Sequence, residues 1–111
     1  MESIKKRSVF KRVYETGKRR GDGLMSVVAV RNPCGGESPL GVTVGRKVGN
    51  AVTRNRVRRL IKENYRLRCK SGIVENGYEI VITARPEAAK ADFREIGESM
   101  DKLFKRLDLR K

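Results

Sequence analysis

The spacing of hydrophobic and polar positions divides the chain into segments of two different periods. Segments 24–31 and 40–45 are rich in valine, and in the second one apolar and small residues alternate. Segment 77–84 is apolar at nearly every position, which is typical of a strand covered on both faces or central in its sheet. We therefore predict strands in these three segments.

A short amphipathic helix is predicted ahead of the first strand. Phe10, Val13 and Tyr14 recur at steps of three and four residues, the spacing of one helix face. Ser8 is the expected amino-terminal cap of this helix, and Gly17 is the expected stop.

Two longer helices are predicted further along the chain. The first begins near residue 50 and fades near residue 70, where Gly72 can terminate it. Its predicted buried stripe consists of Val57, Leu60, Ile61 and Leu67. The second follows Asp92, which forms a capping box with Glu95. Its apolar positions are Phe93, Ile96, Met100, Leu103, Phe104 and Leu107.

The order of these elements predicts an α+β fold. The basic run at 18–21 is interpreted as a turn, and strands 24–31 and 40–45 are expected to pair as a hairpin. The long helix then crosses over to strand 77–84. The expected architecture is a two-layer sandwich of helices on a small mixed sheet of three to four strands, formed by a single domain over 1–111.

Positive charge is concentrated in two parts of the chain. The 111 residues carry a formal net charge of +14, and residues 46–70 alone hold ten Lys or Arg and one acid, a net +9. Residues 1–20 contribute a further +6, whereas residues 71–111 balance eight bases with eight acids. Clustered Lys and Arg favour a polyanionic partner, because phosphate neutralisation releases counterions. Nucleic acid is therefore the expected class of partner.

Composition disfavours several other functions. The chain has no histidine, and Cys34 and Cys69 lack the spacing of metal ligands, which excludes a zinc site and a His-based triad. No signal peptide is recognisable, and no apolar run approaches the roughly 18 residues of a membrane span. We expect a cytoplasmic protein with two reduced thiols, without a membrane or an obligate protein partner.

The basic helix and the turn before it supply most of the candidate RNA contacts. The segment Gly45–Asn50 leads from a strand into a helix, whose unpaired N–H groups favour phosphate. On the helix, Arg54, Arg58 and Lys62 share one row, and Asn55 and Arg59 begin the next. Arginine forks bind phosphate and stack on bases, which suits structured RNA. The alternative is a charged face that only contacts solvent.

A second candidate site lies on the first helix. Phe10 and Tyr14 are one turn apart, and Lys11, Arg12 and Lys18 flank them. Aromatic residues interleaved with cations are typical of a stacking platform for single-stranded nucleic acid. The alternative is that both rings are ordinary core residues.

Three segments of the sequence resemble a known family. The stretch RKVGNAVTRNR at 46–56, followed by VRRLIKE, is similar to the signature of the bacterial ribonuclease P protein component, whose RNR motif corresponds to residues 54–56. The opening VFKRVYETG at 9–17 and the segment GYEIVITARP at 77–86 are similar to further parts of that family. The resemblance covers essentially the whole chain.

The resemblance implies an RNA-dependent endonuclease that removes the 5′ leader from precursor tRNA. In this family a large RNA subunit carries out the hydrolysis with bound Mg²⁺, and the protein is its non-catalytic partner. The implied contacts to the RNA subunit are Arg46, Lys47, Asn50, Arg54, Asn55, Arg56, Arg58, Arg59 and Lys62. The implied leader-binding residues, in a groove between the first helix and the sheet, are Phe10, Tyr14, Lys11 and Lys18.

The resemblance also implies an unusual topology. The family fold is ribosomal-protein-S5-domain-2-like, with a left-handed strand–helix–strand crossover, whereas about 98% of such crossovers are right-handed. Because segment 24–31 has no aromatic residue, no leader stacking is expected from that strand.

Two other functions compete with this interpretation. A binding module of ribosomal or RNA-chaperone type would use the same basic helix without any role in processing. A sequence-specific DNA-binding protein fits less well, since neither a recognition helix nor a dimer seam is evident in the sequence.

Overall fold

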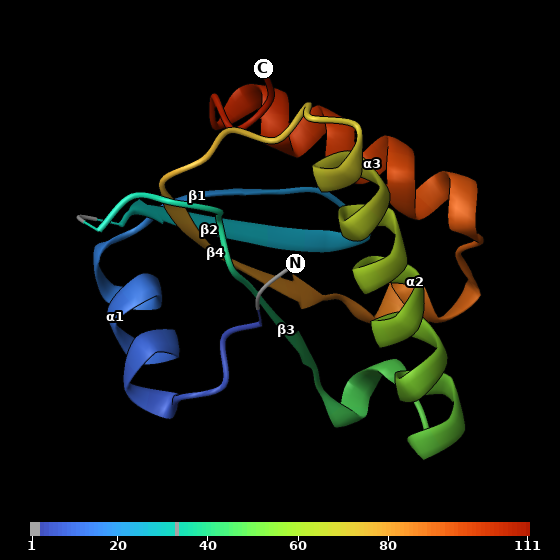
Figure 1. The fold of residues 1–111 in the computed structure, drawn as a ribbon. Helices are drawn as coiled ribbons and strands as arrows, with labels where there is room; N and C mark the ends of the chain where they lie inside the picture. Colours follow the sequence, from blue (N-terminus) through green and yellow to red (C-terminus); the bar gives the residue numbers. More distant parts are fainter. Residues whose placement is uncertain (1–2, 33) are drawn as a thin grey trace.

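The computed structural model describes residues 3–32 and 34–111. The elements follow one another as α1 (Arg7–Thr16), β1 (Lys18–Gly21), β2 (Met25–Arg31), β3 (Leu40–Val44), η1 (Arg46–Val48), α2 (Ala51–Lys70), β4 (Tyr78–Ala84), η2 (Pro86–Lys90) and α3 (Phe93–Arg106). The four strands form one mixed sheet, with α1 on one side and α2 and α3 on the other (Figure 1). The predicted α+β fold with a small mixed sheet is confirmed.

The central strand of the sheet is the last one in the chain. The strand order is β1–β2–β4–β3, in which β2 pairs with β4 antiparallel and β3 pairs with β4 parallel. The predicted hairpin between β2 and β3 is therefore wrong, because β4 lies between them. The nearly continuous apolar run of β4 explains this order, since a central position covers both faces of that strand.

The basic run after α1 is a strand rather than the predicted turn. β1 pairs antiparallel with β2, in a register that sets Lys18 opposite Ala29 and Gly21 opposite Ser26. All four residues of β1 are exposed. A segment of three cations and a glycine lacks apolar alternation, so its backbone pairing with β2, rather than its own sequence, makes it a strand.

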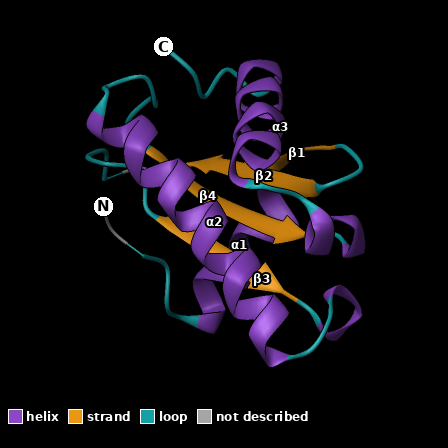
Figure 2. Ribbon diagram, turned by 90° about the vertical axis from the view of Figure 1, so that its right-hand side faces the viewer, coloured by secondary structure: helices purple, strands orange, loops and turns teal. Residues whose placement is uncertain are grey.

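The connection from β3 through α2 to β4 is left-handed. Figure 2 shows α2 in front of the sheet, with β3 and β4 both pointing to the lower right and β4 above β3. An observer looking along the strands with α2 on top therefore finds β4 to the left of β3. Left-handed crossovers are the rarer kind. The left-handed crossover that the family resemblance implies is therefore confirmed.

The main core lies between the sheet and helices α2 and α3. Val57 and Ile61 of α2 are fully buried, as predicted, but Leu67 is 38% exposed and does not anchor the helix. Asn64 and Tyr65 continue the buried stripe instead. The helical period places positions 61, 64 and 65 on one face, so the buried stripe continues through a polar residue that an apolar pattern passes over.

The capping predictions for the other two helices have different outcomes. The Asp92–Glu95 capping box of α3 is confirmed, with the Glu95 N–H donating to Asp92 Oδ1 at 2.8 Å. Gly17 ends α1, and its N–H donates to the Val13 carbonyl at 2.8 Å. The predicted Ser8 cap is wrong, because α1 begins at Arg7, two residues earlier than this cap implies, and the actual cap, Lys6, makes no side-chain hydrogen bond.

Candidate nucleic-acid interface

The turn between β3 and α2 presents two exposed cations before the helix begins. Arg46 and Lys47 lie in η1, directly after β3, and both are exposed. Asn50 caps α2, since its side-chain oxygen accepts from the Thr53 N–H at 2.9 Å. Asn50 thus has a structural role that is independent of any RNA contact.

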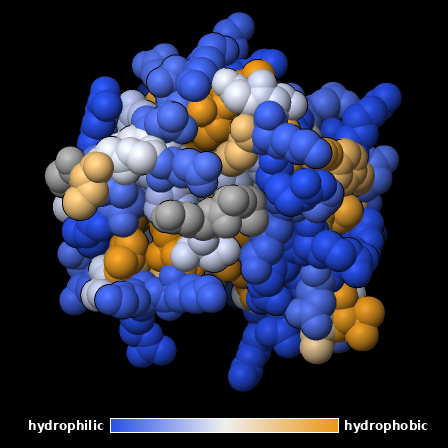
Figure 3. Space-filling view, viewed as in Figure 1, coloured by the Kyte–Doolittle hydropathy of each residue, from blue (hydrophilic) through white to orange (hydrophobic). Residues whose placement is uncertain are grey.

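The outer face of α2 carries a shallow basic hollow of about 340 Å³. Its lining residues, which we call the α2 basic face, are Asn55, Arg58, Arg59, Lys62, Glu63 and Arg66. Within it, Arg58 Nη1 donates to Asn55 Oδ1 at 2.9 Å, so Asn55 helps to hold this arginine in place. In Figure 3, hydrophilic side chains predominate at the right of the view, where α2 lies, although a few hydrophobic ones interrupt them. Of the predicted row, Arg58 and Lys62 line this outward hollow, whereas Arg54 does not.

Arg54 brings an unusual buried polar atom to the same helix. Its Nε is buried and has no hydrogen-bond partner among residues 3–32 and 34–111. A buried N–H without a partner is unfavourable by about 1–3 kcal/mol.

Arg56 differs from its neighbours because it faces into the protein. Its Nη1 donates to the Ala89 carbonyl at 3.1 Å, and its Nη2 donates to the Ala91 carbonyl at 2.8 Å. These contacts fasten α2 to η2 and to Ala91, the residue that follows it. Arg56 therefore has a structural role, and an RNA contact by this residue stays a prediction.

In the carboxyl-terminal half of α2, Arg66 and Arg68 are paired with acids of this protein. Arg66 Nη2 lies 2.5 Å from Glu63 Oε1 on the exposed surface. This hydrogen bond lowers the pKa of the Glu63 carboxyl. Arg68 points instead towards α3, where its Nε lies 2.7 Å from Asp101 Oδ1.

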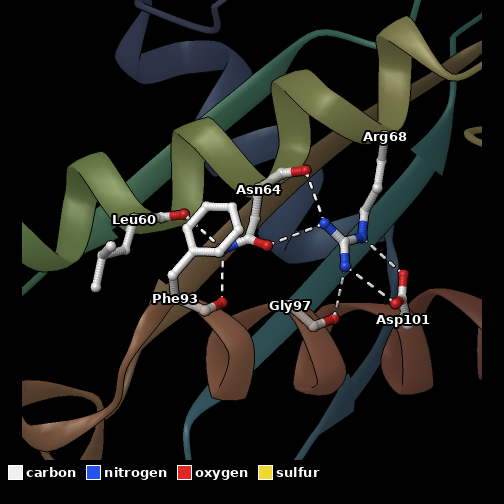
Figure 4. A network of polar contacts seen from close by, with 6 residues as sticks. All are labelled: Leu60, Asn64, Arg68, Phe93, Gly97 and Asp101. Carbon is white, nitrogen blue, oxygen red and sulfur yellow. Dashed lines mark hydrogen bonds and ion pairs between the residues drawn. The ribbon is translucent and has the colours of Figure 1, made fainter.

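Figure 4 shows Arg68 at the centre of a polar network between α2 and α3. Its guanidinium also donates to Asn64 Oδ1 at 3.0 Å and to the Gly97 carbonyl at 3.1 Å. Asn64 in turn donates to the Phe93 carbonyl at 3.1 Å. A Cβ on Gly97 would lie 2.6 Å from Asn64 Oδ1, so only glycine allows the two helices to approach this closely.

Sequence reasoning missed this network, although two signals were present. Asn64 and Arg68 are four residues apart on one helix face, and Gly97 interrupts an otherwise regular amphipathic helix. A glycine within a helix is unfavourable unless a close approach requires it. The pattern would have indicated a polar contact between helices, though not which residues make it.

A second hollow, of about 480 Å³, lies beside α1. Its lining residues are Lys5, Arg7, Phe10, Tyr14 and Thr43. The Tyr14 hydroxyl lies 2.7 Å from Thr83 Oγ1, and it also donates to Thr43 Oγ1 at 3.3 Å. These contacts fix the ring of Tyr14 at the floor of the hollow.

Phe10 and Tyr14 are at once packing residues and surface residues. Both are half-buried, and both pack against the small cluster of Val13, Val28 and Val81 under α1. The Phe10 ring lies over Gly41 of β3, where a Cβ would approach it to 2.7 Å. Because one side of each ring supports α1 and the other lines the hollow, the two interpretations of these residues are compatible.

The structure separates the two lysines that were grouped with these rings. Lys11 is exposed on α1. Lys18 pairs with Ala29, whose side chain belongs to the core on the opposite face of the sheet, so Lys18 is not brought to the hollow. The next residue, Arg19, lies on the α1 face instead, with its guanidinium carbon 5.8 Å from the centre of the Tyr14 ring.

A buried carboxylate that the sequence did not single out holds α1 in place. Glu79 of β4 is 7% exposed, and it forms an ion pair and a hydrogen bond with Arg12 of α1. Arg12 is therefore a structural residue rather than part of a stacking platform. A lone acid within the apolar run of β4 was the available signal.

Comparison with known proteins decides the family. A family model described as Ribonuclease P matches residues 1–108. The chain belongs to the ribonuclease P protein family. Membership makes it a protein component of an endoribonuclease of tRNA processing, with ribonuclease P RNA as its partner.

Individual relatives in this family match over nearly their whole length. The ribonuclease P protein component of Clostridioides difficile (strain 630) is 42% identical over 97% of this chain and 93% of its own. The structure of the RNase P protein of Staphylococcus aureus superimposes with a TM-score of 0.88 at 30% identity, over 100% of this chain and 99% of that one. The RNase P protein from Thermotoga maritima gives a TM-score of 0.82 at 28% identity, over 96% and 97% of the two chains.

Within the described part of the chain, none of the helices has the length and apolar character needed to cross a membrane. Among the same residues, His, Cys, Asp and Glu side chains nowhere gather in threes in a way that would hold a metal ion.

Proposed function

We propose that this ribonuclease P protein helps a catalytic RNA to remove the 5′ leader from precursor tRNA by binding both RNA molecules. The observation that carries the proposal is the presence of two separate surfaces suited to RNA on one small fold. The α2 basic face is a row of outward cations, and the hollow beside α1 combines two aromatic rings with cations. The first suits a folded RNA, and the second suits a single strand.

The proposed contacts to the RNA subunit follow the basic helix and the turn before it. Exposed Arg46 and Lys47, together with the cations of α2, would neutralise phosphates of the folded RNA. The full set is Arg46, Lys47, Asn50, Arg54, Asn55, Arg56, Arg58, Arg59 and Lys62. Asn50 and Arg56 would act mainly by holding the helix in position, given their internal hydrogen bonds.

The proposed leader site is the hollow beside α1. Phe10 and Tyr14 would stack on unpaired bases, and exposed Lys11 would neutralise backbone phosphates. Lys18 lies on the other face of the sheet, so a contact from it would require the leader to pass around the edge at β1.

We infer that the RNA, rather than the protein, carries out the hydrolysis with Mg²⁺. Phosphate oxygens are ligands that Mg²⁺ prefers. Both proposed RNA-binding surfaces carry an excess of cations, which would repel a free divalent ion. The protein would contribute by bringing phosphates of the two RNA molecules together. Because its partners are RNA, we also place its action in the cytoplasm.

Reconstitution with a bacterial ribonuclease P RNA at low Mg²⁺ tests the proposal. The protein should increase cleavage of precursor tRNA at the mature 5′ end, because its cations replace part of the charge screening that Mg²⁺ provides. Cleavage no faster than with the RNA alone would overturn the proposal. Tight binding without any increase in cleavage would instead support an RNA-binding module of ribosomal or chaperone type.

A further inference from the structure

Helix α1 leaves one row of the sheet beneath it uncovered. It runs across the strands, with Phe10 over Gly41 of β3 and Gly17 against Val28 of β2. The row of side chains directly under it is apolar, including Val81 and Val28, which pair across β4 and β2. The neighbouring row, on the Tyr14 side of the helix, is only partly buried or exposed.

This neighbouring row is made of hydroxyl side chains in register. Thr43 pairs with Thr83, Thr83 pairs with Ser26, and Ser26 pairs with Gly21, so the row crosses all four strands. We call Thr43, Thr83 and Ser26 the hydroxyl row. Strands lie about 4.8 Å apart, so the row from β3 to β1 is about 14 Å long. Tyr14 forms its wall on the α1 side, through the contact of its hydroxyl with Thr83.

Two arginines lie near the hydroxyl row where it reaches β1: Arg85 beside Gly21, and Arg19 in the neighbouring row. Arg19 pairs with Val28, which places it on the α1 face of the sheet, and its guanidinium lies against the Tyr14 ring. Arg85 lies across Gly21, where a Cβ would come within 2.6 Å of its Nη2. No ion pair is found for either arginine within residues 3–32 and 34–111. Their charges are therefore available to an external anion.

The hydroxyl row and the two arginines beside it, which we together call the track, have side chains suited to binding a sugar–phosphate backbone. Serine and threonine hydroxyls and arginine forks are common partners of phosphate and sugar oxygens. A hydroxyl can also bond the 2′-OH of ribose, which distinguishes RNA from DNA. The hollow of Phe10, Tyr14 and Thr43 opens onto the β3 end of the same row, since Thr43 belongs to both.

We propose that single-stranded leader RNA continues from this hollow along the hydroxyl row to Arg19 at the edge of the sheet. Arg19 then serves as a specificity-determining residue that favours precursors with longer leaders, and the Tyr14 ring holds its guanidinium in position. This inference rests on the proposed leader site beside α1. It adds to that site a direction for the bound strand and a second anchoring residue.

A matched pair of variants tests the inference in the reconstituted holoenzyme. Arg19→Ala and Arg20→Ala remove the same charge from adjacent residues of β1, but Arg20 pairs with Val27 of the main core and so lies on the opposite face. For precursor tRNA with a long leader, Arg19→Ala should raise the Kd about tenfold, the loss expected for one charged hydrogen bond. Arg20→Ala should change it by less than about twofold, and neither variant should affect a precursor with a very short leader.

Ser26→Ala gives a second, independent measurement. It removes one hydroxyl from the middle of the row and should weaken binding of the long-leader precursor about threefold. Replacing the leader riboses with deoxyribose should produce a loss of similar size in the unaltered protein and little further loss in the Ser26→Ala variant. Circular dichroism melting checks the fold of each variant, and Arg19→Gln replaces Arg19→Ala if the latter is less stable.

The outcomes separate failure of this inference from failure of the proposed function. Equal effects of Arg19→Ala and Arg20→Ala would overturn the inference, because charge alone would then account for both. If Phe10→Ala weakens long-leader binding while Arg19→Ala does not, the leader site stands and the track to β1 is wrong. If neither variant affects long-leader binding, the leader site itself is wrong and the inference falls with it.

Discussion

The two halves of α2 both carry arginines, and those of the carboxyl-terminal half, Arg66 and Arg68, are paired with acids. In the amino-terminal half, Arg58 and Arg59 line an outward hollow, whereas Arg56 donates to the carbonyls of Ala89 and Ala91. In the carboxyl-terminal half, Arg66 is paired with Glu63, and Arg68 is enclosed by groups of α3. The difference lies in the acceptors opposite each half, because α3 packs against the later turns of α2. The use of an arginine thus depends on its neighbours in the fold more than on its position in a basic run.

The largest expected effect is on stability, and it should distinguish Arg68 from Arg66. Arg68→Ala leaves Asn64 and Asp101 without their common donor, and we expect a loss of about 2 kcal/mol in the free energy of unfolding. Urea unfolding followed by circular dichroism measures it. Arg66→Ala is the matched control, and its unfolding midpoint should not move. Equal midpoints for the two variants would show that the network contributes nothing.

A second comparison lies within the RNR motif and the turn after it. Arg56→Ala should lower the free energy of unfolding by about 1–2 kcal/mol, because the carbonyls of Ala89 and Ala91 lose their donor. Arg58→Ala should leave stability unchanged and weaken binding to the RNA subunit. The plot of log affinity against log salt should become shallower for Arg58→Ala by about one unit per lost phosphate contact. The reverse pattern in the two variants would contradict the assignment of structural and binding roles.

A smaller effect, on the salt dependence of RNA binding, is expected when Glu63 is replaced. The hydrogen bond from Arg66 lowers the pKa of the Glu63 carboxyl, so the pair is fully formed at neutral pH and is lost as the pH falls through that lowered pKa. Glu63→Gln should free Arg66 for phosphate and steepen the salt dependence of RNA binding by at most about one unit. The variant should show no such change at a pH where the wild-type carboxyl is already protonated. An unchanged slope at neutral pH would place Arg66 away from the RNA.

The smallest expected difference concerns the two thiols. Cys69, near the end of α2, is partly buried, and burial raises the pKa of its thiol. Cys34 is exposed in the loop before β3. A thiol reagent at mildly alkaline pH should therefore modify Cys34 quickly and Cys69 slowly, and a Cys34→Ser variant should show only the slow phase. Equal rates would indicate that the end of α2 is less firmly packed than the structure shows.

Patterns that depend on local chemistry were predictable from the sequence. The capping box of α3, the stop at Gly17 and the valine-rich strands are each determined by neighbouring residues. The basic helix and its outward row also followed from period and charge. The aromatic hollow could be located, although not the way in which each ring both packs and lines a surface.

The remaining features depend on pairing partners that are distant in the sequence. β1 is a strand because its backbone pairs with the edge of β2. β4 lies between β2 and β3 in the sheet, although it follows both in the sequence. In the sequence, Arg68 cannot be distinguished from its basic neighbours. Its structural role depends on Asp101 and the Gly97 carbonyl of α3, which lie beside it only in the fold. In the same way, Arg19 rather than Lys18 faces Tyr14, since strand register determines which side chain points to which face.

The outermost strands also bear on how this protein behaves at high concentration. An open sheet edge offers unpaired N–H and C=O groups to a second molecule, and cations along an edge strand oppose such pairing. β1 carries Lys18, Arg19 and Arg20 along one edge, and at the other edge the Ile4 N–H donates to the Leu40 carbonyl at 2.9 Å. The small sheet thus resists edge-to-edge pairing with a second molecule, which would lead to aggregation. The three cations that protect the β1 edge also contribute to the net positive charge of the protein.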